Sequence, residues 1–461
     1  MRPVVSVAEM RQIDAQAQRG VPLEALVERA GRAVARAGLG LLGGAYGRRV
    51  VVVAGKGHNG DDGRVAAGRL RRRGVRVTVV EAAEAEGQRL APCDLVVDAA
   101  YGTGFRGHYR APVAPPGASV LSVDVPSGVN GDTGEADDDA VRADATVTFA
   151  ALKPGLLLGQ GRERSGTVEV VDIGLDVGGA RAHLVEDADV AGALRPRPRE
   201  AHKWQTAVYV AAGSPGMRGA AQLCSRAAMR AGAGMVRLGV PGAGPSDLPA
   251  SEVVARVLPA AGWAEEVLSE LERFRALVVG PGLGRSDEAR AAVRRLVAEA
   301  PVPVVVDADG LTLLGSAGEV KALAGGRTAP LVLTPHDGEF GRLAGQAPGA
   351  DRLGAARALA QAAAAVVLLK GSTTVVAPPG GQALLCASGS ARLATAGTGD
   401  VLSGVIAAFL AQGLEARVAA ALAAHAHGAA AGLGPERGLV AGDLLDLLPR
   451  WLSGLAGGVG G

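Results

Sequence analysis

The 461-residue sequence is poor in cysteine, aromatic residues and lysine. Its three cysteines, Cys93, Cys224 and Cys386, lie far apart without a CxxC spacing, which argues against a zinc site and a disulfide framework and fits a reducing cytoplasm. Aromatic residues make up only 3%, so the interior must consist mainly of Ala, Val and Leu, as is typical of α/β proteins. Lysine occurs only at positions 56, 153, 203, 321 and 370, and a lysine kept in so arginine-rich a chain suggests a need for its ammonium group.

The sequence also lacks a strong charge imbalance and long apolar runs. A formal net charge of +2 provides neither a basic stripe nor an acidic tail, so we expect small-molecule partners and no nucleic acid or membrane. The N-terminal stretch MRPVVSVAEMRQID has no apolar signal segment, and no window approaches 18 uninterrupted apolar residues. These absences predict a soluble, cytoplasmic protein.

Two α/β domains are predicted from the length and from the order of apolar segments. Ser6 and Glu9 have the spacing of a capping box, and residues 22–42 carry a longer helical pattern. Short β-rich runs then alternate with helical segments, which favours largely parallel sheets. Because residues 194–204 are dense in Pro and Arg, we place the boundary there, which gives domains 1–193 and 194–461.

The stretch TAGTGDVLSG, residues 395–404, predicts the start of a helix beside an anion. Val401, Leu402, Val405, Ile406, Phe409 and Leu410 form an apolar helical stripe, so residues 397–400 should form its first turn. The unpaired amides of a helix N-terminus attract phosphate, and Gly397 and Gly399 allow the backbone to approach it. Asp400 would then stand beside the phosphate, although an aspartate here could instead cap the helix.

Three further strand ends of the second half carry residues suited to a nucleotide cleft. They are LLKGSTTVV, VVGPGLG and LTPHDGEF, and open α/β sheets bind ligands at such ends. Taken singly, Gly280, Gly282 and Gly284 could be tight-turn glycines and His336 a polar loop residue. Asp307 and Asp309 in VVVDADGL could assist a cation, but we interpret them first as turn residues.

The second half resembles the ADP- or ATP-dependent NAD(P)H-hydrate dehydratases, because the motifs AHK, RGAAQL, GPGLG, TPHDGE, LKGSTT and AGTGDVLSG occur along the chain in the order seen in that family. The resemblance implies a ribokinase-like fold, Mg²⁺, and a reaction in which Asp400 takes the proton of the C6 hydroxyl of the hydrated nicotinamide. That hydroxyl attacks the terminal phosphate, and phosphate then leaves as the dihydropyridine is restored. The implied nucleotide contacts are Lys370, Gly371, Ser372, Thr373, Thr374 and Gly399, and the implied substrate contacts are Ala220, Gly284, His336 and Asp400.

The first half combines a glycine-rich strand-to-helix loop with acidic strand ends. VVVVAGKGHNGDDGRVAAGRL resembles dinucleotide-binding geometry without matching GxGxxG. Asp98, Asp124 and Ser127 follow two further strands, and such oxygen ligands suit a hard cation, although strand-end aspartates also cap turns.

These motifs, together with AGRAVARA, resemble the NAD(P)H-hydrate epimerases, which implies a Rossmann-like α/β/α domain. The resemblance implies K⁺ ligands at Asn59, Asp98 and Ser127 and makes Asp124 the candidate acid/base. The implied substrate contacts are His58, Asn59, Gly60, Asp61, Asp62, Gly102, Thr103, Gly104, Phe105, Arg106, Gly107, His108 and Asp124. The family loop usually reads NNGGDG, whereas this chain has His58 and Asp61, and we expect Asp61 to crowd a position that favours glycine or to change cation affinity.

The two resemblances together predict a bifunctional repair enzyme. It would interconvert the R and S hydrates of NADH and NADPH (NADHX and NADPHX) and dehydrate the S form with ADP, the donor suggested by fused bacterial-type enzymes. We also expect a homo-oligomer. The competing hypotheses are an ATP-dependent kinase of a small hydroxylated vitamin precursor with a non-catalytic N-terminal domain, and a silent nucleotide-binding or scaffolding protein.

Overall fold

The computed structural model describes residues 1–244 and 251–457, which form two compact units. The smaller unit is Arg2–Ala182, and the larger is His183–Gly461 together with Met1. The Pro- and Arg-rich segment at 194–204, on which the sequence-based boundary rests, lies inside the larger unit. The division comes earlier because β8 (Ala182–Leu184) joins the larger sheet beside β17 (Ala383–Cys386) and α6 (Asp187–Ala193) packs on α15 and α16.

The smaller unit is built on one parallel sheet with the strand order β3-β2-β4-β5-β6-β7. Its strands are β1 (Arg2–Val4), β2 (Arg49–Ala54), β3 (Arg76–Glu81), β4 (Leu95–Ala99), β5 (Ser119–Val123), β6 (Ala145–Phe149) and β7 (Thr167–Val171). Its helices are α1 (Val7–Ala17), α2 (Leu23–Leu42), α3 (His58–Arg72), α4 (Ala82–Ala85), η1 (Pro154–Leu156) and α5 (Gly159–Arg164). The capping box of Ser6 and Glu9 at the start of α1 is confirmed.

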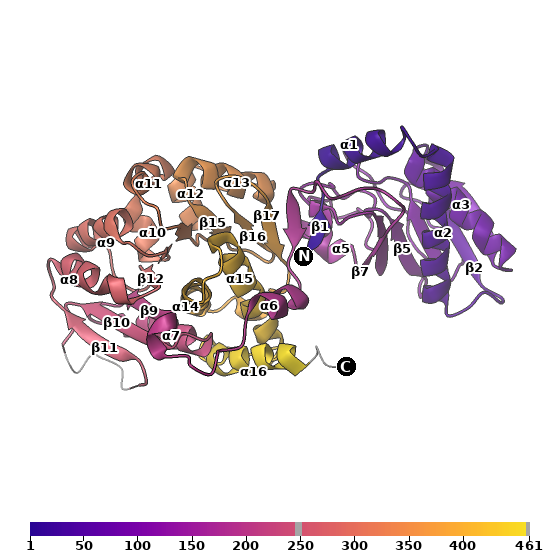
Figure 1. Cartoon of the computed structure of the whole chain (residues 1–461). Coiled ribbons are helices and arrows are strands. Elements are labelled where there is room, and N and C mark those ends of the chain that lie inside the picture. Colours follow the sequence, from indigo (N-terminus) through magenta and orange to yellow (C-terminus); the bar gives the residue numbers. More distant parts are fainter. Residues whose placement is uncertain (245–250, 458–461) are drawn as a thin grey trace. The chain divides into compact units, whose positions relative to one another are not determined.

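Alternate residues of each strand face opposite sides of this sheet, as the strand geometry requires. Val50 and Val52 of β2 belong to the core that α2 and α3 cover, whereas Val51 and Val53 pack with α4 and Tyr109. Figure 1 shows α2 and α3 side by side against the sheet. The result is a Rossmann-like layered unit whose second face is covered by one short helix and by loops.

The larger unit contains a mixed sheet with the order β8-β17-β16-β15-β14-β13-β12-β9-β10-β11. Its further strands are β9 (Ala207–Ala211), β10 (Met235–Pro241), β11 (Val254–Leu258), β12 (Ala276–Val279), β13 (Val304–Val306), β14 (Leu331–Leu333), β15 (Val366–Leu369) and β16 (Thr374–Ala377). Neighbouring strands are parallel along the part β15-β14-β13-β12-β9-β10-β11 of the sheet. The pairs β15–β16 and β16–β17 are antiparallel.

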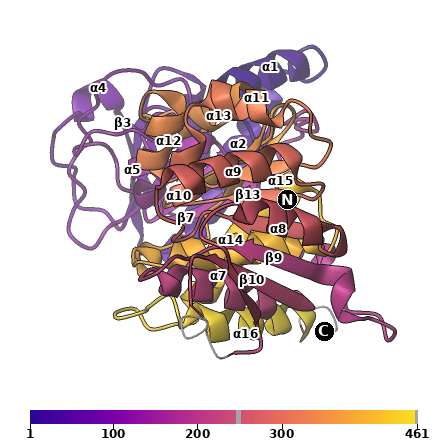
Figure 2. The ribbon, with the colours of Figure 1, turned by 90° about the vertical axis from the view of Figure 1, so that its left-hand side faces the viewer.

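Helices cover both faces of this larger sheet (Figures 1 and 2). One layer holds α7 (Arg218–Arg230), α14 (Thr398–Ala411), α15 (Ala416–Gly432) and α16 (Leu444–Gly457). The remaining helices are η2 (Lys203–Thr206), α8 (Trp263–Glu270), η4 (Leu271–Arg273), α9 (Asp287–Glu299), α10 (Asp309–Leu314), α11 (Ala317–Ala324), α12 (Asp337–Ala344), α13 (Arg352–Ala363) and η5 (Ala391–Leu393). Residues Val401–Ala411 of α14 are buried all round, so this helix is a core element and not the one-sided stripe that the sequence predicts.

Each sheet has a point at which the strand order reverses, between β2 and β4 and between β9 and β12. In open α/β sheets, ligands bind beyond the carboxyl ends of the strands at such points. The loops after β2, β4, β9 and β12 are therefore placed for binding. No helix in the described ranges is long and apolar enough to cross a membrane.

Candidate functional site

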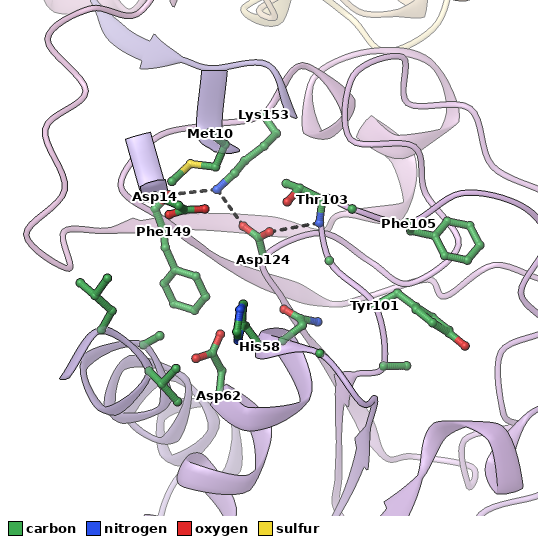
Figure 3. A pocket seen from close by; sticks show the side chains of 18 of the residues that line it. Met10, Asp14, His58, Asp62, Tyr101, Thr103, Phe105, Asp124, Phe149 and Lys153 are labelled. Atoms are coloured by element: carbon green, nitrogen blue, oxygen red, sulfur yellow. Dashed lines mark hydrogen bonds and ion pairs between the residues drawn. The ribbon is translucent and has the colours of Figure 1, made fainter. Parts of the chain in front are cut away.

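A cavity of about 720 Å³ opens at the carboxyl ends of the strands in the smaller unit (Figure 3). It collects side chains from α1, from α2, from the start of α3 and from the loops after β4, β5 and β6. Of the residues predicted from the sequence, it brings together His58, Asn59, Asp62, Gly102, Thr103, Gly104, Phe105, Arg106, His108 and Asp124. Gly107 lines a neighbouring cavity of about 320 Å³ that shares Phe105 and Arg106.

Asp124 follows β5 with a positive φ of 68°, a conformation that non-glycine residues seldom adopt. Its Oδ2 accepts a hydrogen bond from the amide of Thr103 at 3.3 Å, and its Oδ1 accepts one from Thr148 Oγ1 at 3.1 Å. The Nζ of Lys153 lies 2.7 Å from the same Oδ1. The carboxylate is thus held in one orientation at the wall of the cavity.

Lys153 is the functional residue of this half that reasoning from the sequence did not assign. Its side chain is 1% exposed, and its ammonium donates to Thr148 Oγ1 at 2.8 Å and to the carbonyl of Phe149 at 2.9 Å besides facing Asp124. A buried ammonium is stable only when it is paired and hydrogen-bonded, so these partners fix both the lysine and the aspartate. In the sequence, only the scarcity of lysine could have indicated that Lys153 is important.

The altered loop at the start of α3 fits the backbone without strain. A Cβ at Gly60 would lie 1.9 Å from the carbonyl oxygen of Gly55, so glycine is required there. Asp61 has an ordinary helical φ, its side chain is 48% exposed, and its Oδ1 lies 3.5 Å from Arg64. The expectation that Asp61 crowds the loop is therefore wrong, because its side chain points to solvent.

Asp62 contributes a nearly buried carboxyl group to the cavity wall. It is 8% exposed, and no hydrogen bond or ion pair joins its side chain to another residue in the described part of the chain. Burial, followed by the charges of Asp124, Asp61 and Asp14, raises the pKa of Asp62 to about 8. Asp62 is consequently protonated for much of the time at neutral pH.

The three predicted K⁺ ligands offer only oxygen donors from the chain, which suits a hard cation. Asp98 is buried and accepts hydrogen bonds from Ser127 Oγ at 2.6 Å, from the Ser127 amide at 2.9 Å and from Ser122 Oγ at 2.9 Å. Burial raises the pKa of Asp98 despite these bonds. The amide nitrogen of Asn59 is buried without a partner, and its Oδ1 lies 3.2 Å from where a Cβ on Gly102 would stand.

The exposed end of the 102–108 turn is tied to a second loop by His108. Its Nδ1 lies 2.7 Å from Asp137 Oδ2, and its Nε2 lies 3.3 Å from Asp139 Oδ2. The hydrogen bond with Asp137 and the charge of Asp139 raise the pKa of His108. Tyr101 directly precedes this turn, and its ring packs against Phe105 and Tyr109.

In the larger unit, Asp400 stands in the first turn of α14, after the positive-φ residue Gly397, as predicted. No hydrogen bond joins its carboxyl group to any described residue, so Asp400 does not cap the helix. Burial and the charge of Asp307 raise the pKa of Asp400 to about 7, against the opposing charge of Lys370. A carboxyl group of that pKa can accept a proton near neutral pH.

Beside Asp400, Lys370 forms an ion pair that was not predicted from the sequence. Its Nζ donates to Asp307 Oδ1 at 2.8 Å, and Ser403 Oγ donates to Asp307 Oδ2 at 2.6 Å. Burial opposes the charge of Asp307, but the Lys370 ammonium holds its pKa below the usual value. Burial likewise opposes the Lys370 charge, yet Asp307 and Glu339 raise the pKa of Lys370. The turn interpretation is wrong for Asp307.

Asp309, in contrast, does organise a turn. Its carboxylate accepts hydrogen bonds from the amide of Gly284 at 3.0 Å and from Arg285 Nε at 2.9 Å. This fixes the glycine loop after β12 against the start of α10. In that loop, Gly284 approaches the Met217 side chain, and a Cβ on its neighbour Gly282 would lie 3.3 Å from the Cβ of Ala220. The predicted substrate contacts Ala220 and Gly284 therefore lie close to each other, beside Met217.

His336 is the N-cap of α12 and not a free loop residue. Its Nδ1 accepts hydrogen bonds from the amides of Gly338 and Glu339, at 3.0 and 3.4 Å, and its own amide donates to Glu339 Oε2 at 2.9 Å. The side chain is still 56% exposed, so Nε2 can meet a ligand. Burial raises the pKa of Glu339, whose Oε2 lies 4.0 Å from Lys370 Nζ.

The predicted phosphate contacts converge only in part. A Cβ on Gly399 would lie 3.3 Å from Lys370 Nζ, so the glycine-rich start of α14 and the lysine after β15 form one surface. Residues 371–374 connect β15 to β16, with Thr374 as the first residue of β16. Arg352 supports this connection, because it donates to the carbonyl of Lys370 at 2.6 Å while forming two hydrogen bonds with Asp337.

Comparison with solved structures places the larger unit among known folds. Its neighbours include an ADP/ATP-dependent NAD(P)H-hydrate dehydratase from Bacillus subtilis that was co-crystallised with ATP and Mg²⁺, with 32% identity and a TM-score of 0.51 over 59% of this chain and 97% of that chain. A ribokinase-like superfamily protein from Enterococcus faecalis gives a TM-score of 0.51 at 22% identity, over 59% of this chain and 95% of that chain. The fold and the sites thus define a two-part α/β enzyme with a Rossmann-like and a ribokinase-like unit.

Sequence comparisons identify the family. The NAD(P)H-hydrate dehydratase family matches residues 208–451, and the YjeF-related protein N-terminus family matches residues 23–91 and 80–155. A bifunctional NAD(P)H-hydrate repair enzyme Nnr from Salinibacter ruber is 38% identical over 97% of this chain and 96% of its own length, and one from Mycobacterium tuberculosis is 42% identical over 91% and 92%. The chain belongs to the family of bifunctional NAD(P)H-hydrate repair enzymes.

Proposed function

We propose that the larger unit, predicted as domain 194–461, dehydrates the S hydrate of NADH or NADPH, with ADP as phosphoryl donor and AMP and phosphate as products. The observation that carries this proposal is Asp400, a carboxyl group without a partner at the start of α14 whose pKa is about 7. Asp400 takes the proton of the C6 hydroxyl, and the hydroxyl oxygen attacks the terminal phosphate of the nucleotide. Phosphorylation turns a poor leaving group into a good one, and the loss of phosphate restores the dihydropyridine.

In this proposal the nucleotide phosphates lie between the N-terminus of α14 and the ammonium group of Lys370. Residues 371–374 and Gly399 make further contacts with the nucleotide. The ion pair with Asp307 holds Lys370 in place for that task. Asp307 and Asp309 already have partners, so a Mg²⁺ ion accompanying the nucleotide would be held mainly by phosphate oxygens. Ala220, Gly284 and His336 face the hydrated nicotinamide.

For the smaller unit, predicted as domain 1–193, we propose interconversion of the R and S hydrates in the cavity of Figure 3. Asp124 acts as acid/base, and the loop 58–62 and the turn 102–108 bind the substrate. Asn59, Asp98 and Ser127 would hold a K⁺ ion, which supplies positive charge beside the binding loop. The all-oxygen donor set supports that assignment. A cytoplasmic homo-oligomer completes the proposal.

The experiment is recovery of the reduced-nicotinamide absorbance from separated S and R hydrates, supplied with Mg²⁺, K⁺ and either ADP or ATP. We expect recovery from S with ADP, and recovery from R faster than its spontaneous epimerisation. Recovery only with ATP would correct the donor. A stable phosphorylated product from a small hydroxylated vitamin precursor, without recovery from either hydrate, would instead establish the kinase.

A further inference from the structure

We propose that Asp62 is a second proton-carrying catalytic residue of the smaller unit and acts at C6 of the hydrated nicotinamide from a different wall than Asp124. This inference rests on the proposed function of that unit, because it concerns how the R and S hydrates interconvert. It assigns to Asp62 a chemical step and not only a binding contact.

The two carboxyl groups reach one cavity from separate elements. Asp62 stands on α3, whereas Asp124 follows β5, and both side chains line the 720 Å³ cavity. Figure 3 shows Asp62 on the α3 side of the cavity and Asp124 on the side of Lys153 and Thr103. A substrate ring that occupies the cavity can therefore have a carboxyl group near each of its faces.

The two groups differ in the hydrogen-bond donors that surround them. Asp124 is bound by the Lys153 ammonium, by the Thr148 hydroxyl and by the Thr103 amide, all of which donate to it. Asp62 has no donor among the described residues and is nearly buried. Two carboxyl groups of one site whose environments differ in this way can take the separate roles of base and acid.

The charged groups around Asp62 maintain this difference. Asp14 on α1, Asp61 on its own helix and Asp124 after β5 all disfavour its ionised form, in addition to burial. Two of the nearby cations are bound to other carboxylates, since Lys153 binds Asp124 and Arg64 binds Glu81. Lys56 and His58 also line the cavity, and His58 Nδ1 lies 3.7 Å from the exposed Asp61.

The step is balanced without an external oxidant or reductant. The hydroxyl that faces Asp62 takes the Asp62 proton, the C6–O bond breaks, and water leaves as the N1 lone pair forms the N1=C6 bond. A water molecule then adds to the other face of C6, and the N1=C6 electrons return to N1. The proton released by that water goes to Asp124. The opposite epimer follows the same path in reverse. Between turnovers in one direction, Asp124 releases its proton to solvent water and Asp62 takes one up, which restores the starting state.

The test measures interconversion by the full chain with ADP omitted, so that the dehydratase half stays idle, and then measures S-hydrate repair with ADP added. Asp62→Asn keeps the shape of the side chain but removes the proton carrier. We expect a loss of at least about 100-fold in both directions of interconversion, with S-hydrate repair unchanged. The matched control is Glu84→Gln on α4, an exposed carboxyl group that does not line the cavity, and this variant should stay within about threefold of wild type.

Two further readouts separate chemistry from structure. Hydrates that interconvert in H₂¹⁸O should carry ¹⁸O at C6 at the enzyme-dependent rate. Asp62→Glu, which retains a displaced proton carrier, should recover part of the rate lost in Asp62→Asn. Interconversion by wild type should also fall as the pH rises through about 8, because Asp62 must be protonated, and Asp62→Asn should lose this limb.

Near wild-type interconversion by Asp62→Asn, equal losses in the Asn and Glu variants, or interconversion without ¹⁸O incorporation would each overturn the inference. A wild-type chain that repairs S but never interconverts the hydrates would instead overturn the proposed function of the smaller unit, and this inference with it. An active wild type with an active Asp62→Asn variant overturns the inference alone.

Discussion

Both units place a lysine against a strand-end aspartate, but they use the pair differently. In the smaller unit, Lys153 binds Asp124, the candidate acid/base itself. In the larger unit, Lys370 binds Asp307, and the candidate base Asp400 is left without a hydrogen-bond partner. A lysine–aspartate ion pair therefore fixes the candidate acid/base in the smaller unit, whereas in the larger unit it fixes an aspartate beside the candidate base.

The difference shows two ways to prepare a carboxyl group for proton transfer. Donors around Asp124 hold that carboxylate in one orientation, whereas burial and the charge of Asp307 raise the pKa of Asp400. Asp62 resembles Asp400 in this respect, since both are partly or fully buried and lack donors. In each unit, a paired carboxylate lies in the same site as an unpaired one.

The largest effect should follow from Asp400→Asn. We expect S-hydrate dehydration to fall by about 10³-fold, because the amide cannot take the hydroxyl proton, while R-to-S conversion and nucleotide binding persist. Burial raises the pKa of Asp400 from 3.8 to about 7, so stability falls as the pH rises between these two values and the full loss is present above about pH 7. In that range the variant should unfold at a higher temperature than wild type. Asp446→Asn, on the surface of α16, is the control. Dehydration near the wild-type rate would remove Asp400 from its proposed role.

Asp124→Asn should abolish the activity of the smaller unit and leave that of the larger unit intact, the reverse of Asp400→Asn. We expect R-to-S conversion to fall by about 10²-fold or more, with dehydration of the S hydrate unchanged, since the two carboxylates belong to different units. Rates measured on the separated hydrates test this directly. If both activities fall together, the sites are not independent.

Lys153→Met should weaken the smaller unit and its chemistry together. The variant leaves Asp124 as a largely buried charge without its cation, and breaking such a pair costs about 3–5 kcal/mol. Thermal unfolding of the smaller unit should shift downward while S-hydrate repair by the larger unit survives. Lys321→Met, on the surface helix α11, is a control lysine. An unshifted transition would show that the Lys153–Asp124 pair contributes nothing to stability.

The sequence predicts those parts of the sites that depend on neighbouring residues. The start of α14 at Gly397, the capping box at Ser6 and the alternating strands follow from local patterns, and the structure contains them. Local patterns also predict that the strand ends carry the polar residues. These features need no knowledge of tertiary contacts.

Pairings between distant segments could not be predicted in the same way. Asp307 and Lys370 meet because β13, β14 and β15 are adjacent and parallel, and spacing alone made Asp307 resemble the turn residue Asp309. Lys153 reaches Asp124 from beyond β6, and only the scarcity of lysine indicated its importance. The unit boundary was displaced for the same reason, since β8 is held by a strand far along the chain.

The rates of the two activities should change in opposite directions as the pH rises. Dehydration needs ionised Asp400, so its rate should rise with pH, level off above about pH 8 and be about fivefold lower at pH 6 than at pH 7. Interconversion needs protonated Asp62, so its rate should decline above about pH 8. Initial rates for each hydrate across this range provide the measurement. Parallel profiles would contradict the different environments of the two groups.

The smallest effect should come from Asp61→Gly, which restores the usual family loop. Because Asp61 is exposed and has a helical φ, the substitution relieves no clash, and glycine in the first turn of α3 should cost about 0.5–1 kcal/mol of stability. Removing its charge also removes one contribution to the raised pKa of Asp62, so the alkaline limit of interconversion should move slightly downward. Epimerase activity within about twofold of wild type at pH 7 is expected. A gain of tenfold or more would mean that Asp61 restrains the loop through a contact that this conformation lacks.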